Sequence, residues 1–339
     1  MSAGRLTERA LIGIARRRAG DVLPGVRVGI GDDCAVLEPR AGAPLLATTD
    51  LLVEDVHFRR RWTSPADLGW KSLAVNLSDI AAMGGRPRWA LVALACPAET
   101  SLEEVEAFFG GALALASAHD VVLVGGDTSA SPSGWIVNVT LLGEAATAPL
   151  LRSTARVGDV LAVTGPLGRS AAGLTLLELP APPPAVPADA STDVRAAHLR
   201  PRPRLREGQW LAAAGGVTAM IDLSDGLAAD VAHIAEESRV GARVDLPRLP
   251  VDESTRCVAR ALDRDPLAWA TGGGEDYELL LACDSHALDR LTAGLALATG
   301  AVLSPIGEIV ERKEGVRFVG AGGRDVQVAP GFEHFVASR

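Results

Sequence analysis

The chain has 339 residues, 48% of them hydrophobic, and its 42 acidic residues exceed its 33 basic residues to give a formal net charge of −9. This length predicts two domains of ordinary size, and this hydrophobic share excludes disorder as the main state. The negative charge disfavours nonspecific binding to nucleic acid or to an anionic membrane, because both repel an acidic protein.

Any phosphate ligand of this chain needs a source of positive charge other than lysine. Only Lys71 and Lys313 are lysines, and no glycine precedes a Lys-Ser or Lys-Thr pair, which excludes a P-loop nucleotide site. No apolar run approaches the ~18 residues of a membrane-spanning helix, and the N-terminal segment lacks the apolar core of a secretory signal. We therefore expect a cytoplasmic protein.

Strands and helices are predicted to alternate along the first half of the chain. Apolar spacing over Leu6–Ile14 predicts an amphipathic helix. Helix-start signals follow at Ser64-Pro65 and at the Ser101–Glu104 capping box, and these helices are predicted to end at Gly84-Gly85 and near His119. The predicted strands, which are apolar runs bounded by turn-forming residues, are Val28–Val36, Pro44–Thr49, Trp89–Ala95, Val121–Val124 and Trp135–Gly143.

A shift to small residues and proline around Glu144–Leu150 predicts a domain boundary, so residues 1–147 and 148–339 are expected to form separate domains. Val157–Thr164 is predicted to begin the second domain as a strand, Pro180–Pro187 predicts an exposed loop, and a helix is predicted after Gly226. Alternation of strands and helices is typical of an α/β or α+β fold.

Four groups of acidic residues stand where a predicted strand meets a glycine-rich or tight turn, the usual place for a site in an α/β protein. They are Asp32-Asp33, Asp50, Asp127 and Glu275-Asp276. For any one of them alone, turn chemistry or helix capping is the better explanation. The four together favour a functional site.

Asp79 is a different kind of candidate, because it lies inside an apolar helix and on the same face as Asn76. Burying an unpaired carboxylate costs several kcal/mol, so a cation or strong donors must meet it. The pattern Asn76–Asp79 is echoed by Asp222–Asp225 in the second half. There, Ser224 as a helix N-cap and Asp225 as a first-turn acid remain an alternative interpretation.

Oxygen ligands without His or Cys partners select hard cations, so Mg²⁺ is the expected metal. Several Mg²⁺ ions would also let an acidic chain without a P-loop lysine hold a polyphosphate. Arginines that could assist are Arg152 and the cluster Arg200, Arg202, Arg204 and Arg206, although such clusters are often only surface charge.

Six motifs, in matching order and spacing, resemble those of the thiamine-monophosphate kinase family, which belongs to the aminoimidazole-ribonucleotide synthetase superfamily. The resemblance covers the chain from about Leu6 to Phe335. The motifs are Gly29–Ala35, Thr49-Asp50 with His57-Phe58, Ala74–Gly84, Gly125–Thr128, Ile221–Leu227 and Gly273–Leu279.

The resemblance implies a two-domain enzyme that uses ATP as co-substrate, binds several Mg²⁺ ions and forms a homodimer. Residues 1–147 would bind ATP and Mg²⁺, and their four-stranded sheet would pair with that of a second subunit. Residues 148–339 would form a second α/β domain that completes the active site. The expected partners are thiamine monophosphate and ATP. We expect neither a nucleic acid nor a membrane partner.

The resemblance also implies roles for individual residues. The implied Mg²⁺ ligands are Asp33, Thr48, Thr49, Asp50, Asp79, Asp127, Asp222 and Asp225. The implied ATP contacts are Gly125, Gly126, Arg152 and Ser224, and the implied contacts to thiamine monophosphate are His57, Glu275 and Phe332. No catalytic side chain is implied beyond the metal-positioning Asp50, Asp79 and Asp127.

Three positions depart from the family pattern. Asp55 stands where a small residue, usually Gly, follows Val-Glu, and Thr154 replaces a usual Gly after Arg152-Ser153. Phe332 occupies a position that is often Tyr and keeps the ring for stacking. A buried, structural role is the alternative for His57, although its place after the Asp50 turn favours an exposed site.

The implied reaction moves the γ-phosphoryl group of ATP onto the phosphate of thiamine monophosphate, giving thiamine diphosphate and ADP, the last step of thiamine diphosphate biosynthesis. We expect metal-mediated charge neutralisation and no covalent phospho-enzyme. The alternatives are a sister ATP enzyme, such as an aminoimidazole-ribonucleotide synthetase, a selenophosphate synthetase or a hydrogenase-maturation protein, and a non-catalytic nucleotide or Mg²⁺ sensor. The motifs of His57 and Glu275 disfavour the purine reaction. The N-terminus lacks the reactive Cys and Lys that selenophosphate synthesis needs.

Overall fold

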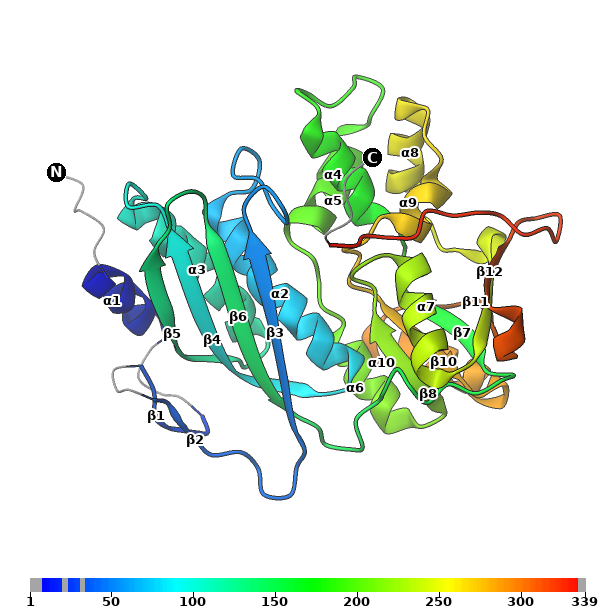
Figure 1. The fold of residues 1–339 in the computed structure, drawn as a ribbon, viewed down its shortest axis with the longest axis horizontal. Helices are drawn as coiled ribbons and strands as arrows, with labels where there is room; N and C mark the ends of the chain where they lie inside the picture. The colour runs from blue at the N-terminus through cyan, green and yellow to red at the C-terminus, as the bar shows by residue number, and fades with distance from the viewer. Residues whose placement is uncertain (1–7, 20–23, 31–33, 335–339) are drawn as a thin grey trace. The chain divides into compact units, whose positions relative to one another are not determined.

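The computed structural model of the chain describes residues 8–19, 24–30 and 34–334. It divides into two compact units, which are labelled by element in Figure 1. The first unit comprises Met1–Ile80 and Gly85–Thr147, and the second comprises Ala81–Gly84 and Ala148–Arg339. Each unit contains both helices and strands, which confirms the predicted mixed fold class.

The first unit is a four-stranded sheet with two long helices on one face (Figure 1). Its strand order is β3 (Leu45–Val53), β6 (Ile136–Glu144), β4 (Arg86–Cys96) and β5 (Val122–Ala130), and only β4 and β5 run parallel. The helices are α2 (Pro65–Ala82) and α3 (Leu102–Ala118), and α1 (Glu8–Ala19) packs beside α3. A short ribbon joins β1 (Val26–Val28) to β2 (Val36–Leu37).

The two long helices begin where the sequence predicts. The Ser64 hydroxyl accepts a bond from the Asp67 N–H, and Ser101 forms a complete capping box with Glu104. These bonds satisfy N–H groups that have no partner within their own helix.

Three predicted strands of the first unit differ from the observed ones. The predicted strand Val28–Val36 is wrong, because its ends belong to separate short strands, β1 and β2. The strand predicted to stop at Thr49 continues to Val53, so Asp50 lies within β3 instead of in a turn. Likewise, Asp127 lies within β5, because pairing with β4 continues through the glycine pair.

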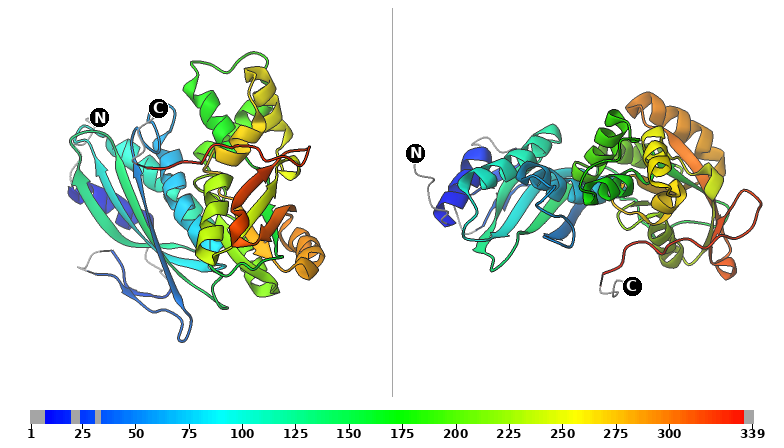
Figure 2. Two further views of the ribbon diagram at one scale, coloured as in Figure 1. Left: turned by 45° about the vertical axis from the view of Figure 1, so that its right-hand side comes forward. Right: turned by 90° about the horizontal axis from the view of Figure 1, so that it is seen from above.

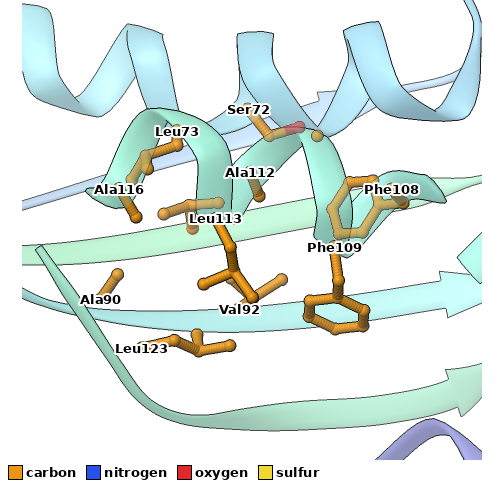
Figure 3. A pocket seen from close by; sticks show the side chains of 12 residues that line it. Ser72, Leu73, Ala90, Val92, Phe108, Phe109, Ala112, Leu113, Ala116 and Leu123 are labelled. Atoms are coloured by element: carbon orange, nitrogen blue, oxygen red, sulfur yellow. The ribbon is translucent and has the colours of Figure 1, made fainter. Parts of the chain in front are cut away.

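A small internal gap lies between helices α2 and α3 and the sheet, and it is lined by apolar side chains such as Leu73, Phe108 and Leu123 (Figure 3). Its volume is about 10 Å³, which is room for about one water molecule. This gap is therefore a packing defect of the core and not a ligand site.

The second unit is built on a six-stranded sheet that is antiparallel except at one edge. Its order is β12 (Val316–Val319), β9 (Gly241–Asp245), β11 (Leu303–Val310), β7 (Val160–Thr164), β10 (Leu279–Cys283) and β8 (Val217–Asp222). Its helices are α4 (Arg169–Glu178), α5 (Ala188–Leu199), α6 (Leu205–Ala214), α7 (Leu227–Ser238), α8 (Glu253–Leu262), α9 (Pro266–Gly272) and α10 (Leu288–Thr299).

The proline-rich loop and the helix after Gly226 are confirmed in the second unit. Residues 180–187 connect α4 to α5 as an irregular segment, the green loop at the top of the left view in Figure 2. Val186 is its one buried residue and joins an apolar cluster with Leu176 and Val194. Within the described residues, no helix combines the length and apolar character needed to cross a membrane.

The contact between α2 and α3 depends on glycine. A Cβ atom at Gly111 would lie 1.9 Å from the Ala66 carbonyl oxygen, whereas one at the neighbouring Gly110 would meet nothing within 4 Å. We predict that Gly111→Ala lowers the free energy of unfolding by about 2–3 kcal/mol, because the helices must separate. Gly110→Ala is the matched control and should raise it by up to about 1 kcal/mol. Urea denaturation measures both, and equal effects would contradict the close contact.

Candidate functional site

In the first unit, two of the predicted acidic ligands, Asp50 and Asp79, come together between β3 and α2. Thr48 and Asp50 stand two residues apart on β3 and therefore share one face of the strand. The Thr48 hydroxyl donates a hydrogen bond to the Asp79 carboxylate of α2. Burial, followed by the negative charge of Asp79, raises the pKa of Asp50 to about 7. The structure thus brings three predicted ligands together, all with oxygen donors.

The other two predicted ligands of the described first unit lie on the opposite face of the sheet. Leu51, Asn138, Ala93 and Asp127 follow one another across β3, β6, β4 and β5 and so share a face. Asn138 donates to the Thr49 hydroxyl at 2.9 Å, which places Thr49 on that face as well. Asp127 is exposed, and its Oδ1 accepts the Thr128 N–H at 2.8 Å. Asp33 lies outside the described residues.

The glycine pair before Asp127 has a structural reason of its own. The register of β5 against β4 shifts between Ala90 and Leu91 of β4. Directly after this shift, Gly125 pairs with Leu91 and Gly126 pairs with Val92. A Cβ at Gly126 would lie 1.8 Å from the Val92 carbonyl oxygen, and its φ is +154°. Only glycine fits there, whether or not a nucleotide binds.

His57 belongs to the tight turn that follows β3. Its Nδ1 accepts the Val53 N–H at 3.0 Å, so in the neutral ring the proton is on Nε2. Asp55 in the same turn has φ of +66°. A left-handed conformation is the one that favours glycine, which explains why the family usually has a small residue here.

In the second unit, four predicted site residues meet at the turn between β8 and α7. The Ser224 carbonyl oxygen accepts the Glu275 N–H at 2.7 Å, and the Asp225 carbonyl oxygen accepts the Phe332 N–H at 2.9 Å. Segments that lie about fifty and one hundred residues apart in sequence are joined in this way. The N-cap of α7 is Gly226, and no side chain caps the helix, so the alternative of Ser224 as an N-cap is wrong.

Arg152 is not brought to this turn in the same way. Its carbonyl oxygen accepts the Ser238 hydroxyl at 2.8 Å, and Ser238 is the last residue of α7. The backbone of Arg152 therefore lies beside the end of α7 that is remote from Ser224. Nearby, the Thr154 hydroxyl donates to the Thr218 carbonyl oxygen at 2.5 Å, a bond that the usual glycine could not make.

Glu275 is held by a buried histidine that the motifs did not reveal. His198 is 3% exposed, and its Nδ1 lies 3.2 Å from Glu275 Oε2 and 3.0 Å from the Ser170 hydroxyl. Glu275 itself has φ of +57°, so its backbone is held in a conformation that few residues adopt. The adjacent Asp276 accepts the Gly168 N–H at 2.6 Å, and burial raises its pKa to about 7.

The arginine cluster divides into structural and exposed members. Arg204 pairs with the buried Glu278, its Nε lying 2.6 Å from Glu278 Oε2, whereas Arg200 and Arg202 are exposed. These three arginines, together with Arg169, line a cavity of about 230 Å³ that also contains carboxylates. Arg206 donates to the Ala298 carbonyl oxygen at 3.1 Å. The cluster therefore serves partly to balance buried acids.

Sequence reasoning also missed Asp230 and His233 of α7. Their ligand atoms and one of Asp225 lie within 4.8 Å of one another. Burial and the charges of Asp222 and Asp225 raise the pKa of Asp230 to about 8. The spacing Asp-x-x-His on a helix could have indicated this group, because it places both side chains on one face.

The raised pKa of Asp50 predicts how stability depends on pH. In the unfolded chain this carboxyl loses its proton near 3.8, whereas the folded protein keeps it until about 7. The folded state therefore binds more protons between these values, and stability falls as the pH rises through this window. In the presence of a metal chelator, the free energy of unfolding of Asp50→Asn should exceed that of the parent by roughly 1–3 kcal/mol at pH 8. At pH 4 it should not exceed that of the parent. Denaturation at both pH values tests this, with substitution of an exposed carboxylate of α3, Glu103→Gln, as control. An unchanged pH profile for Asp50→Asn would contradict it.

Comparisons with known proteins agree with this architecture. The family model of the AIR synthase related protein, N-terminal domain, matches residues 31–145, and that of the C-terminal domain matches residues 156–320. Thiamine-monophosphate kinase of Salmonella typhimurium is 40% identical over 314 residues, covering 91% of this chain and 92% of the relative.

Solved structures give the same result. The crystal structure of thiamine-monophosphate kinase from Stenotrophomonas maltophilia is 39% identical, with a TM-score of 0.81, and the match covers 95% of this chain and 99% of that one. The structure of AaThiL complexed with AMPPCP and TMP is 31% identical, with a TM-score of 0.76, covering 99% and 100% of the two chains. The chain belongs to the thiamine-monophosphate kinase family, with the two AIR-synthase-type domains of that family.

Proposed function

We propose that this protein is a thiamine-monophosphate kinase, which transfers the γ-phosphoryl group of ATP to the phosphate of thiamine monophosphate to give thiamine diphosphate and ADP. The observation that carries the proposal is the 40% identity to the Salmonella kinase over nearly the whole of both chains. The AaThiL structure, which is similar over its full length, contains AMPPCP and TMP. The reaction is the last step of thiamine diphosphate biosynthesis, and the cytoplasmic location stays a prediction from the sequence.

The reaction needs positive charge more than it needs a base. The acceptor phosphate has a second pKa near ~6, so its oxygen is already deprotonated at neutral pH. Two single negative charges ~4 Å apart repel by about 4 kcal/mol at an effective dielectric of ~20. The chain must therefore gather charge-neutralising groups around the two phosphates and hold them in line.

The residues between β3 and α2 fit Mg²⁺. Thr48, Asp50 and Asp79 offer only oxygen donors, and the raised pKa of Asp50 reflects negative charge and burial without compensation. Mg²⁺, when bound, would neutralise phosphate charge and hold phosphate oxygens. The Thr48–Asp79 hydrogen bond orients the Asp79 carboxylate for that role.

The implied Mg²⁺ ligands require more than one ion. Thr49 and Asp127 lie on the face of the sheet opposite to Asp50, so one ion cannot reach all of them. The first unit contributes Asp33, Thr48, Thr49, Asp50, Asp79 and Asp127, and the second contributes Asp222 and Asp225. The metal-positioning Asp50, Asp79 and Asp127 support catalysis without acting as acid or base.

The other predicted site residues of the two domains, 1–147 and 148–339, are assigned to the nucleotide and to the acceptor. The ATP contacts are Gly125, Gly126, Arg152 and Ser224, and the contacts to thiamine monophosphate are His57, Glu275 and Phe332. The ring of Phe332, which is 49% exposed, offers an apolar face for an aromatic ligand. Glu275 offers a carboxylate to the positively charged thiazolium ring.

The exposed face of the first sheet favours a homodimer. Leu45 and Leu51 of β3 are 53% and 52% exposed, so this strand presents large apolar side chains to solvent. A second copy of the same sheet would cover them. We predict that Leu51→Lys shifts the protein from dimer to monomer in sedimentation, while Glu103→Gln leaves the mass unchanged. A parent protein that sediments as a monomer would contradict the dimer.

One assay tests three parts of the proposed function separately: the product formed, the need for Mg²⁺ and the identity of the acceptor. Purified protein with ATP, Mg²⁺ and thiamine monophosphate should form thiamine diphosphate and ADP in equal amounts, as measured by chromatography. Omitting Mg²⁺, or replacing the acceptor with free thiamine, should abolish the product. ATP binding without any product would instead favour the sensor or a sister enzyme.

Loss of one carboxylate charge at the first-unit site should stop turnover. We predict that Asp79→Asn lowers kcat at saturating Mg²⁺ by at least about 10²–10³-fold, because the amide no longer balances the cation. Asp50→Asn should behave alike, and circular dichroism should match the parent for both. Glu103→Gln is the control with parental activity. A near-parental rate for Asp79→Asn would remove the carboxylate from the mechanism.

A further inference from the structure

The start of α7 carries a group of metal-ligating side chains that the proposed kinase does not use as a set. Asp225 precedes the helix, and Asp230 and His233 follow on one face of it. One ligand atom from each lies within 4.8 Å of the other two. Ligands that share a cation with bonds of about 2.1 Å lie up to about 4.2 Å apart, so small side-chain shifts would close this group on an ion.

Asp230 shows that this group needs a partner. Its side chain is 1% exposed, and the backbone N–H groups of Asp225 and Gly226 donate to it. Its Oδ2 atom nevertheless has no hydrogen-bond partner in the structure of the described residues. A buried polar atom without a partner costs free energy, and a cation bound at this atom would offset that cost.

The chemistry of the three side chains indicates which cation fits. An imidazole beside carboxylates suits first-row transition metals, whereas Mg²⁺ prefers oxygen ligands alone. A carboxylate followed three residues later by His on one helix face is also the spacing that di-iron and di-manganese helix bundles use.

We propose that Asp225, Asp230 and His233 form a binding site for a divalent transition metal of the Mn²⁺ or Zn²⁺ class, in addition to the Mg²⁺ of the reaction. Asp225 would serve both sets, while Asp230 and His233 belong to this site alone. The proposal does not rest on the kinase reaction, because metal binding is measured without substrates.

The test titrates the full chain with Mn²⁺ in excess Mg²⁺ and follows free Mn²⁺ by electron paramagnetic resonance. His233 is exposed, so His233→Ala should fold normally and weaken the tightest Mn²⁺ site by at least about tenfold. His286→Ala is the matched control, since His286 also lies beside an aspartate, Asp284, and should leave the titration unchanged. Pulsed resonance of bound Mn²⁺ should show nitrogen coupling in the parent that His233→Ala lacks.

Asp230→Asn supplies a second measurement. The amide oxygen can still accept the backbone N–H groups of the turn, but the variant loses the charge that a cation needs, so Mn²⁺ should bind at least about tenfold more weakly. Equal Mn²⁺ affinity in the parent and both variants, with no nitrogen coupling, would overturn the site. Formation of thiamine diphosphate with Mg²⁺ is a separate readout, so failure of one proposal is distinguishable from failure of the other.

Discussion

Each unit brings carboxylates close together, and the repulsion between them constrains the fold of both units. In the first unit, Asp50 and Asp79 face each other closely enough for repulsion to add to burial and move a carboxyl pKa to about 7. In the second, Asp222, Asp225 and Asp230 do the same around one turn. Folding tolerates these contacts only if protons or cations accompany them. Either a retained proton or a bound cation would therefore contribute to the stability of these regions.

Local signals in the sequence predicted the helices well and the strands less well. Ser64-Pro65 and Ser101 with Glu104 satisfy free N–H groups within one turn, so neighbouring residues are enough to locate a helix start. The end of β3 depends instead on its partner β6, which pairs with it as far as Val53. No feature near Thr49 indicates that pairing, and so Asp50 was predicted in a turn.

The sequence selects candidate residues for the site but does not predict how they are arranged in space. Acids at the predicted strand ends made Asp50, Asp127 and Glu275 candidates, yet strand register decides that Asp127 faces away from Asp50. The approach of Glu275 and Phe332 to the turn before α7 rests on backbone bonds between distant segments. His198 stood in no motif, because its relation to Glu275 arises only when α5 packs beside that loop.

On strand β3, Thr48 and Asp50 lie on one face, and Thr49 lies on the other together with the exposed Leu45 and Leu51. Side chains alternate strictly along a strand, so inserting or deleting one residue before Thr48 would exchange the two faces. The length of this segment should therefore be held constant among relatives even where residue types drift. In the Pro180–Pro187 loop, where Val186 is the one buried side chain, a change in length would not exchange two faces of a strand. Changes in chain length are thus expected to accumulate there rather than in the sheet.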